Sequence, residues 1–116
     1  MALRTTKEIG DFYEKLACKH YETQGHNILE RNYRYKNSEI DIISAFENFI
    51  YFVEVKFRAT NKFGNAEEMV TPEQEKRIVD AAEAYILDNN INAFIRFDIV
   101  VFDHKKEIRI FKDAFG

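Results

Sequence analysis

The stretch Ser38-Glu-Ile-Asp-Ile-Ile-Ser-Ala-Phe-Glu-Asn-Phe-Ile-Tyr-Phe-Val-Glu-Val-Lys-Phe57 decides how the rest of the chain is interpreted. It has the pattern of two apolar strands joined by a short turn. Charged residues interrupt each strand. Side chains of a strand alternate between its two faces, so Glu39 and Asp41 are expected on one face of the first strand. By the same rule, Glu54 and Lys56 share one face of the second strand.

The register of this hairpin determines which charges meet. A tight turn centred on residues 47–48 places Asp41 opposite Glu54 and Glu39 opposite Lys56. Directly opposed side chains have Cβ atoms about 4.5–5.5 Å apart, and like charges there are destabilising. Two facing carboxylates need a counter-charge, which a divalent cation or Lys56 would supply. The alternative is an ordinary hairpin with one apolar face and one solvated, charged face.

Length and composition predict a single globular domain over residues 1–116, with 46% hydrophobic and 32% charged residues. No apolar run approaches roughly 18 residues, and the N-terminus lacks the apolar core of a secretory signal. We therefore expect no association with a membrane. The single cysteine, Cys18, suits a packing role in the reducing cytoplasm, where we expect the protein to reside. The net charge of −3 is not typical of a nucleic-acid binder, although acidic metal ligands would contribute to it.

An amphipathic helix is predicted over residues 5–24 from apolar residues that recur at helical spacing. Thr5 and Glu8 form a capping box at its start, and Gly25 ends it. Glu14 lies on the flank of the apolar stripe. A lone glutamate there is either solvated or directed at a neighbouring element.

Basic and aromatic residues alternate along a predicted strand at residues 26–35 and the turn that follows it. Arg31, Arg34 and Lys36 interleave with Tyr33 and Tyr35. This mixture suits phosphate contact and base stacking. It equally suits a solvated edge strand that charge protects from aggregation.

A long polar segment, residues 57–70, follows the hairpin and has no clear periodicity. Loops of this length in compact domains are usually functional or mobile. The segment leaves directly from the charged end of the hairpin. Arg58 and Lys62 are thus available to contact a polyanion there.

The remaining elements are predicted as a helix and two strands, at residues 71–90, 93–102 and 107–112. Thr71 and Gln74 form a second capping box at the start of the helix. Asp98 interrupts an apolar strand and needs a partner, for which Arg96 on the same face is available. A helix, a three-strand meander, a helix and further strands predict an α/β sandwich built on a mixed sheet.

Specific motifs are spread over nearly the whole chain: Gly10-x-x-x-Glu14-x-x-Ala17, Gly25, Asn32, Glu39-Ile-Asp-Ile-Ile, Phe52-Val-Glu-Val-Lys-Phe-Arg58, Phe63-Gly64, Val70 and Arg96-Phe-Asp-Ile-Val100. Together they resemble the YraN-like family of small bacterial proteins. That family resembles the PD-(D/E)XK nuclease superfamily, and archaeal Holliday-junction resolvases in particular. The resemblance implies a restriction-endonuclease-like α-β-β-β-α-β core, with a mixed central sheet flanked by helices.

The resemblance also assigns catalytic roles to four residues. Asp41 matches the acidic residue of the nuclease motif, Glu54 and Lys56 match its Glu-x-Lys, and Glu14 matches a glutamate of the N-terminal helix. It implies Mg²⁺ or Mn²⁺ bound by Asp41, Glu54, the Val55 carbonyl and Glu14, directly or through water. Lys56 would orient the attacking water or stabilise developing negative charge.

The expected substrate is nucleic acid, DNA in the first place and including branched DNA. The residues proposed to contact it are Arg31, Arg34, Lys36, Arg58, Lys62 and Gln74. The chain departs from the family pattern at Gln74, usually lysine, and at Tyr13 and Ser38, usually glycine. Junction-cutting relatives act as dimers, so the resemblance raises a homodimer without indicating an interface. The alternative function is a non-catalytic nucleic-acid-binding or protein-interaction module, because fold alone does not determine function.

Overall fold

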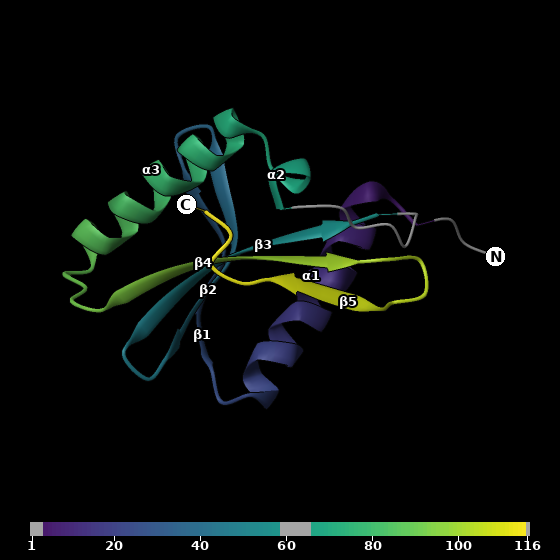
Figure 1. Cartoon of the computed structure of the whole chain (residues 1–116), viewed down its shortest axis with the longest axis horizontal. Helices are drawn as coiled ribbons and strands as arrows, with labels where there is room; N and C mark the ends of the chain where they lie inside the picture. Colours follow the sequence, from purple (N-terminus) through teal and green to yellow (C-terminus); the bar gives the residue numbers. More distant parts are fainter. Residues whose placement is uncertain (1–3, 59–65, 116) are drawn as a thin grey trace.

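The computed structural model describes residues 4–58 and 66–115 as a mixed five-stranded sheet with helices on its faces (Figure 1). The elements are α1 (Thr6–Thr23), β1 (Asn27–Tyr35), β2 (Ser38–Phe46), β3 (Phe49–Phe57), α2 (Ala66–Met69), α3 (Pro72–Asp88), β4 (Phe94–Phe102) and β5 (Ile108–Phe111). The short α2 was not predicted, because it falls in the segment without a periodic pattern. Lys62 lies outside the described residues.

The strands follow one another in space as they do in sequence, β1-β2-β3-β4-β5. The first three form an antiparallel meander, β4 runs parallel to β3, and β5 runs antiparallel to β4. A parallel neighbour requires a crossover connection, and the segment holding α3 supplies it. The predicted α-β-β-β-α-β core is confirmed, with β5 as an additional edge strand.

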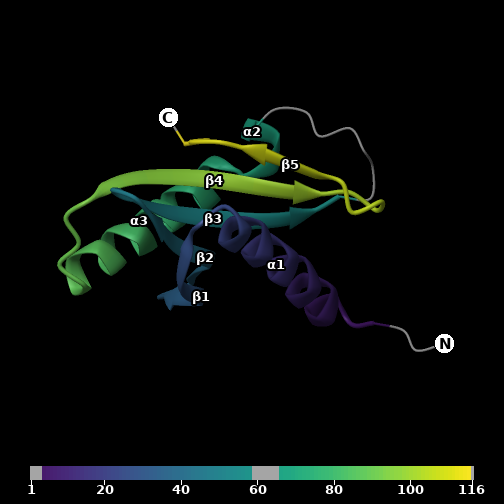
Figure 2. The same ribbon diagram turned by 90° about the horizontal axis from the view of Figure 1, so that it is seen from below.

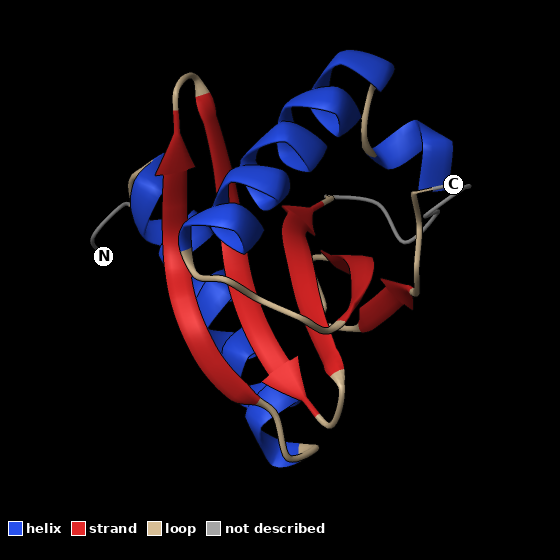
Figure 3. Ribbon diagram, turned by 90° about the vertical axis from the view of Figure 1, so that its left-hand side faces the viewer, coloured by secondary structure: helices blue, strands red, loops and turns tan. Residues whose placement is uncertain are grey.

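Two apolar clusters lie on opposite faces of the sheet. The cluster under α3 is centred on Phe52, and the cluster under α1 includes Val53, the next residue along β3. Ala81 of α3 and Ala17 of α1 have no solvent exposure, which lets each helix approach the strands closely. Figures 2 and 3 show the two long helices on either side of the sheet. Cys18 is buried in the α1 cluster, as predicted.

Both predicted capping boxes are present. The Thr5 hydroxyl accepts a hydrogen bond from the Glu8 amide at 3.1 Å, and the Thr71 hydroxyl accepts one from the Gln74 amide at 3.2 Å. The Gln74 carboxamide accepts a hydrogen bond from the Thr71 amide in return, at 3.0 Å. Gly25 follows the end of α1 with φ +99°, a backbone conformation that L side chains rarely adopt. None of the helices in the described part of the chain is both long and apolar enough to cross a bilayer.

Thr71→Ala is expected to lower the free energy of unfolding by about 1 kcal/mol, because the first-turn amides of α3 lose their acceptor. Urea denaturation followed by circular dichroism measures this loss. Thr71→Ser keeps the hydroxyl acceptor and should stay close to the wild type. Equal stability of the alanine variant and the wild type would contradict the capping role.

The predicted hairpin register is confirmed between β2 and β3, where the pairs run from Ile42–Val53 to Phe46–Phe49. The regular alternation of β2 stops at Asp41. Ile40 packs in the cluster under α3, whereas Ile42 packs in the cluster under α1, although strict alternation would place both on one face. The irregularity therefore lies at Asp41, one of the charged residues that interrupt the apolar pattern of the hairpin.

A buried ion pair fixes the start of β4. Arg96 donates hydrogen bonds to both carboxylate oxygens of Asp98, at 2.9 Å from Nε and 3.1 Å from Nη2. Asp98 also accepts hydrogen bonds from the Tyr21 hydroxyl of α1, at 2.9 Å, and from the Asp113 amide, at 3.0 Å. The predicted pairing is confirmed, and it connects α1, β4 and the C-terminal segment.

The two tyrosines of β1 pack partly against the cluster under α3. Tyr33 is half-buried and meets Tyr85 of α3 edge to face, with ring centroids 5.1 Å apart. Tyr35 is also half-buried and packs on the cluster under α3. Packing against α3 uses part of each ring, and base stacking by these tyrosines stays a prediction.

Candidate metal centre

The centre of the site is the carboxylate pair Asp41 and Glu54, one residue from each strand of the β2–β3 hairpin. The Val55 amide donates a hydrogen bond of 2.8 Å to Asp41 Oδ2, which holds this carboxylate against β3. Glu54 Oε1 is shielded from solvent and has no hydrogen-bond partner among the described residues. Lys56 is half-buried two residues further along β3. A buried carboxylate oxygen without a partner is costly and calls for a cation or a proton.

The pKa values of Asp41 and Glu54 show the same need for a cation or a proton. Burial raises the pKa of Asp41 to about 7, against the smaller opposing effect of the Val55 hydrogen bond. Burial also raises the pKa of Glu54 well above its ordinary value, and the neighbouring Asp41 charge raises it further. The positive charge of Lys56 acts in the other direction on both groups but does not balance them. The pair therefore keeps protons to a higher pH than ordinary carboxylates do, unless a cation replaces them.

A second layer of carboxylates lies beside this pair. The Asn32 side-chain amide donates hydrogen bonds to Glu14 Oε1 of α1 at 2.8 Å and to Glu39 Oε1 of β2 at 2.9 Å. Arg31 Nη2 lies 3.6 Å from Glu14 Oε1, and Arg34 Nη2 lies 3.1 Å from Glu39 Oε2. Burial raises the pKa of Glu14, and the Asn32 hydrogen bond opposes this rise. The charges of Glu14 and Glu39 both raise the pKa of Asp41, so the second layer favours the protonated form of this carboxylate.

The donor atoms fit a hard divalent cation that keeps part of its water shell. Within residues 4–58 and 66–115, no three His, Cys, Asp or Glu side chains gather closely enough to form a complete ligand set. Mg²⁺ is commonly held by only one or two carboxylates together with water. Asp41 and Glu54 supply two carboxylates. Because the amide and carbonyl of a strand residue point to the same neighbour, the Val55 carbonyl is directed toward Asp41 as well.

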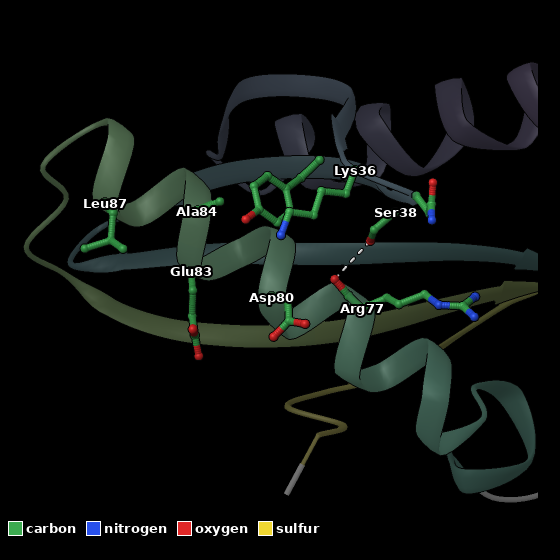
Figure 4. A pocket seen from close by; sticks show the side chains of 9 residues that line it. Lys36, Ser38, Arg77, Asp80, Glu83, Ala84 and Leu87 are labelled. Carbon is green, nitrogen blue, oxygen red and sulfur yellow. Dashed lines mark hydrogen bonds between the residues drawn. The ribbon is translucent and has the colours of Figure 1, made fainter.

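Two adjoining hollows border α3, and the smaller one reaches Glu54; together we call them the α3 groove. Its outer part, about 370 Å³, lies between the β1–β2 turn and α3, and its inner part, about 140 Å³, reaches Glu39 and Glu54. Both parts are lined by Asn37, Ser38 and Arg77. The Ser38 hydroxyl donates a hydrogen bond of 2.9 Å to the Arg77 carbonyl and ties the two walls together (Figure 4).

Comparison with known proteins decides the family. The sequence profile described as "Uncharacterised protein family UPF0102" matches residues 13–102, which include the whole β2–β3 hairpin. The chain belongs to this family.

Several UPF0102 relatives match over nearly their full lengths. A UPF0102 protein of Clostridioides difficile is 46% identical over 111 residues, which cover 94% of this chain and 97% of the relative. A UPF0102 protein of Clostridium perfringens is 39% identical, covering 94% of each chain, and one of Flavobacterium psychrophilum is 38% identical, covering 93% of each. The YraN-like resemblance is thereby confirmed.

The predicted nucleic-acid contacts of this UPF0102 chain lie in different places. Gln74 lines the inner α3 groove and Lys36 the outer groove, where Figure 4 shows Lys36 beside α3. Arg31 and Arg34 pair with the second-layer carboxylates. Arg58 donates a hydrogen bond to the Phe57 carbonyl at the end of β3.

Two residues at the site were missed by reasoning from sequence. Asn32 was noted only as part of a family motif, and its link to Glu14 requires the packing of α1 against the sheet. Arg77 lies on the helical face that borders both parts of the α3 groove. The sequence offered no distinct signal for Arg77, because a lone arginine on an amphipathic helix is usually solvated.

Proposed function

We propose that this UPF0102 member is a divalent-metal-dependent endonuclease that hydrolyses phosphodiester bonds of DNA, including branched DNA. The observation that carries the proposal is the half-buried Asp41–Glu54 pair, in which a shielded carboxylate oxygen of Glu54 has no hydrogen-bond partner among the described residues. The positive charge of Lys56 acts on both carboxylates. Such a pair is unfavourable without a cation, and it lies at the inner end of an open groove. The restriction-endonuclease-like strand order supports the same assignment.

Each residue of the centre has a role that follows from its position. Asp41, Glu54 and the Val55 carbonyl would hold Mg²⁺ or Mn²⁺, and Glu14 would act on it directly or through water. The bound ion would supply charge neutralisation at the phosphate and activation of a water. The Lys56 side chain would orient the attacking water or stabilise negative charge on the phosphate.

The experiment is a cleavage assay with linear, nicked and four-way DNA in the presence of Mg²⁺ or Mn²⁺. The wild type is expected to cleave at least one substrate, and the near-isosteric Glu54→Gln variant none. Glu22→Gln, an exposed position of α1, serves as the matched control and should retain wild-type activity. Absence of wild-type cleavage, or equal cleavage by Glu54→Gln, would refute the nuclease proposal.

DNA would approach the centre along the α3 groove, where Arg77 is shared by both parts. Arg77→Ala is expected to weaken DNA binding and to reduce the slope of log K against log salt by about one, as the loss of a single phosphate contact does. Lys105→Ala is the control, because Lys105 is exposed on the β4–β5 turn, distant from α3 (Figure 1). Fluorescence anisotropy over a salt series measures both slopes. Identical slopes for the two variants would exclude the groove as the DNA path.

A second candidate function is a non-catalytic nucleic-acid-binding module. It is favoured by the net charge of −3 and by the pairing of Arg31 and Arg34 with Glu14 and Glu39, which reduces the free positive charge near the centre. Salt-dependent DNA binding without cleavage under every metal condition would identify this function.

A homodimer is part of the nuclease proposal, because cutting both strands of a DNA junction uses two metal centres. Sedimentation with and without four-way DNA tests it.

A further inference from the structure

Asn32 has an unusual backbone for the middle of a strand. Its φ is +53°, in the left-handed region that few residues other than glycine adopt and that asparagine tolerates best. Its two neighbours pair with Ile42 and Ile40 of β2, so Asn32 lies across from Asp41, between two regular pairs. The distortion of β1 therefore coincides with the point where β2 loses its alternation.

The side chain of Asn32 connects the two outer carboxylates. A primary amide has two N–H donors, and its Nδ2 atom donates to Glu14 at 2.8 Å and to Glu39 at 2.9 Å. These carboxylates come from α1 and β2, which are separate in the sequence and meet through this amide. Like charges at such short range repel each other, and the shared donor offsets this repulsion.

Three simple replacements at this position each fail at least one of the two demands. Glycine would accept the backbone conformation but would leave the two carboxylates unbridged. Aspartate would tolerate the backbone but would add a third negative charge in place of the donor. Alanine would remove the bridge and strain the backbone as well.

The two hydrogen bonds of Asn32 contribute little to the stability of the folded protein. Asn32 is exposed, and both of its hydrogen bonds are exposed, so they compete with water and contribute little to folding. Their clearer consequence is positional: they hold the carboxylate of Glu14 against the sheet at the level of Asp41. Groups that orient the surroundings of a metal commonly change metal affinity by about 10–100-fold when removed.

We propose that Asn32 is a positioning residue of the metal centre, which bridges Glu14 and Glu39 so that both carboxylates stay in the layer beside the Asp41–Glu54 pair that holds the cation. The inference rests on the proposed metal centre and adds a residue that would touch neither metal nor substrate. Arg31 and Arg34 complete the arrangement: Arg31 lies near the Glu14 oxygen that Asn32 contacts, and Arg34 pairs with the other oxygen of Glu39.

The test is Mn²⁺ affinity measured by calorimetry at pH 8, together with thermal unfolding of the same samples. Asn32→Gly keeps the left-handed backbone and removes the amide. The expected result is a 10–100-fold weaker Mn²⁺ affinity, with little change in melting temperature. Asn32→Ala should show the same loss of affinity and a lower melting temperature from backbone strain. Asn90→Gly is the matched control, since Asn90 has φ +50° at the end of α3 and no role at the site.

The outcomes separate the inference from the function on which it rests. If the wild type binds Mn²⁺, Asp41→Asn does not, and Asn32→Gly binds like the wild type, the positioning role alone is refuted. A lower melting temperature for Asn32→Gly with unchanged affinity would show a merely structural role and refute it as well. If the wild type does not bind Mn²⁺, or Asp41→Asn binds equally well, the metal centre fails and the inference fails with it.

Discussion

Without divalent metal, the protein is expected to lose stability as the pH rises toward 8, and Mg²⁺ is expected to restore it. Asp41 has a folded-state pKa of about 7, whereas its ordinary value is 3.8. Between these values the folded protein binds more protons than the unfolded chain, so its free energy of unfolding falls as the pH rises. The contribution of Asp41 is present in full below the unfolded pKa and lost as the pH passes the folded pKa. A shift from 3.8 to about 7 corresponds to roughly 4 kcal/mol as an upper bound.

Urea unfolding of the wild type at several pH values between 5 and 8, with and without Mg²⁺, measures this effect. Asp41→Asn is the required comparison, because it removes the titrating carboxylate and keeps the rest of the fold. The comparison also cancels His26, whose lowered pKa gives stability the opposite pH dependence. We expect the variant to be more stable than the wild type at pH 8 without metal, and unaffected by Mg²⁺. A wild-type stability no more pH-dependent than that of the variant would contradict the account.

Asp98→Ala is expected to cost about 3 kcal/mol of stability, at the lower end of the range for breaking a buried ion pair. The substitution leaves Arg96, the Tyr21 hydroxyl and the Asp113 amide without their common acceptor. The effect is at the lower end because the Arg96 side chain is 26% exposed and still reaches solvent. Chemical denaturation gives the loss directly.

The control for this variant is Asp80→Ala, which removes an ion pair on the protein surface. Asp80 pairs with Lys76 one turn away on α3, and both side chains are largely exposed. Such a pair contributes about 0.3–0.5 kcal/mol. If the two variants lost similar stability, Asp98 would not be the junction of α1, β4 and the C-terminal segment that its contacts indicate.

Much of the fold could be predicted from the sequence because its signals are local. The capping boxes at Thr5 and Thr71 each involve residues three positions apart, so they are visible in a short window of sequence. The hairpin register followed from a two-residue turn and a strict alternation of side chains. The pairing of Arg96 with Asp98 likewise needed only two positions on one face of a strand.

The remainder depends on contacts between elements that are distant in the sequence. The loss of alternation at Asp41 accompanies its hydrogen bond to the Val55 amide and the left-handed backbone of Asn32, and no local pattern encodes either feature. Tyr33 looked exposed because its strand is polar, yet α3 covers its ring through Tyr85. Whether Glu14 faces solvent or the site was equally open until α1 was placed on the sheet.

Titration calorimetry of Mn²⁺ binding at pH 7, repeated in buffers with different ionisation enthalpies, shows whether the Asp41–Glu54 pair holds a metal ion. Metal binding to carboxylates with raised pKa values must displace protons. Asp41 is close to half-protonated at this pH, and burial together with the Asp41 charge raises the pKa of Glu54 well above its ordinary value. The wild type should bind one ion in this centre and release protons, seen as a heat that changes with the buffer, and Asp41→Asn should give neither signal. Wild-type binding without proton release, or equal binding by Asp41→Asn, would show that the Asp41–Glu54 pair is not a metal centre.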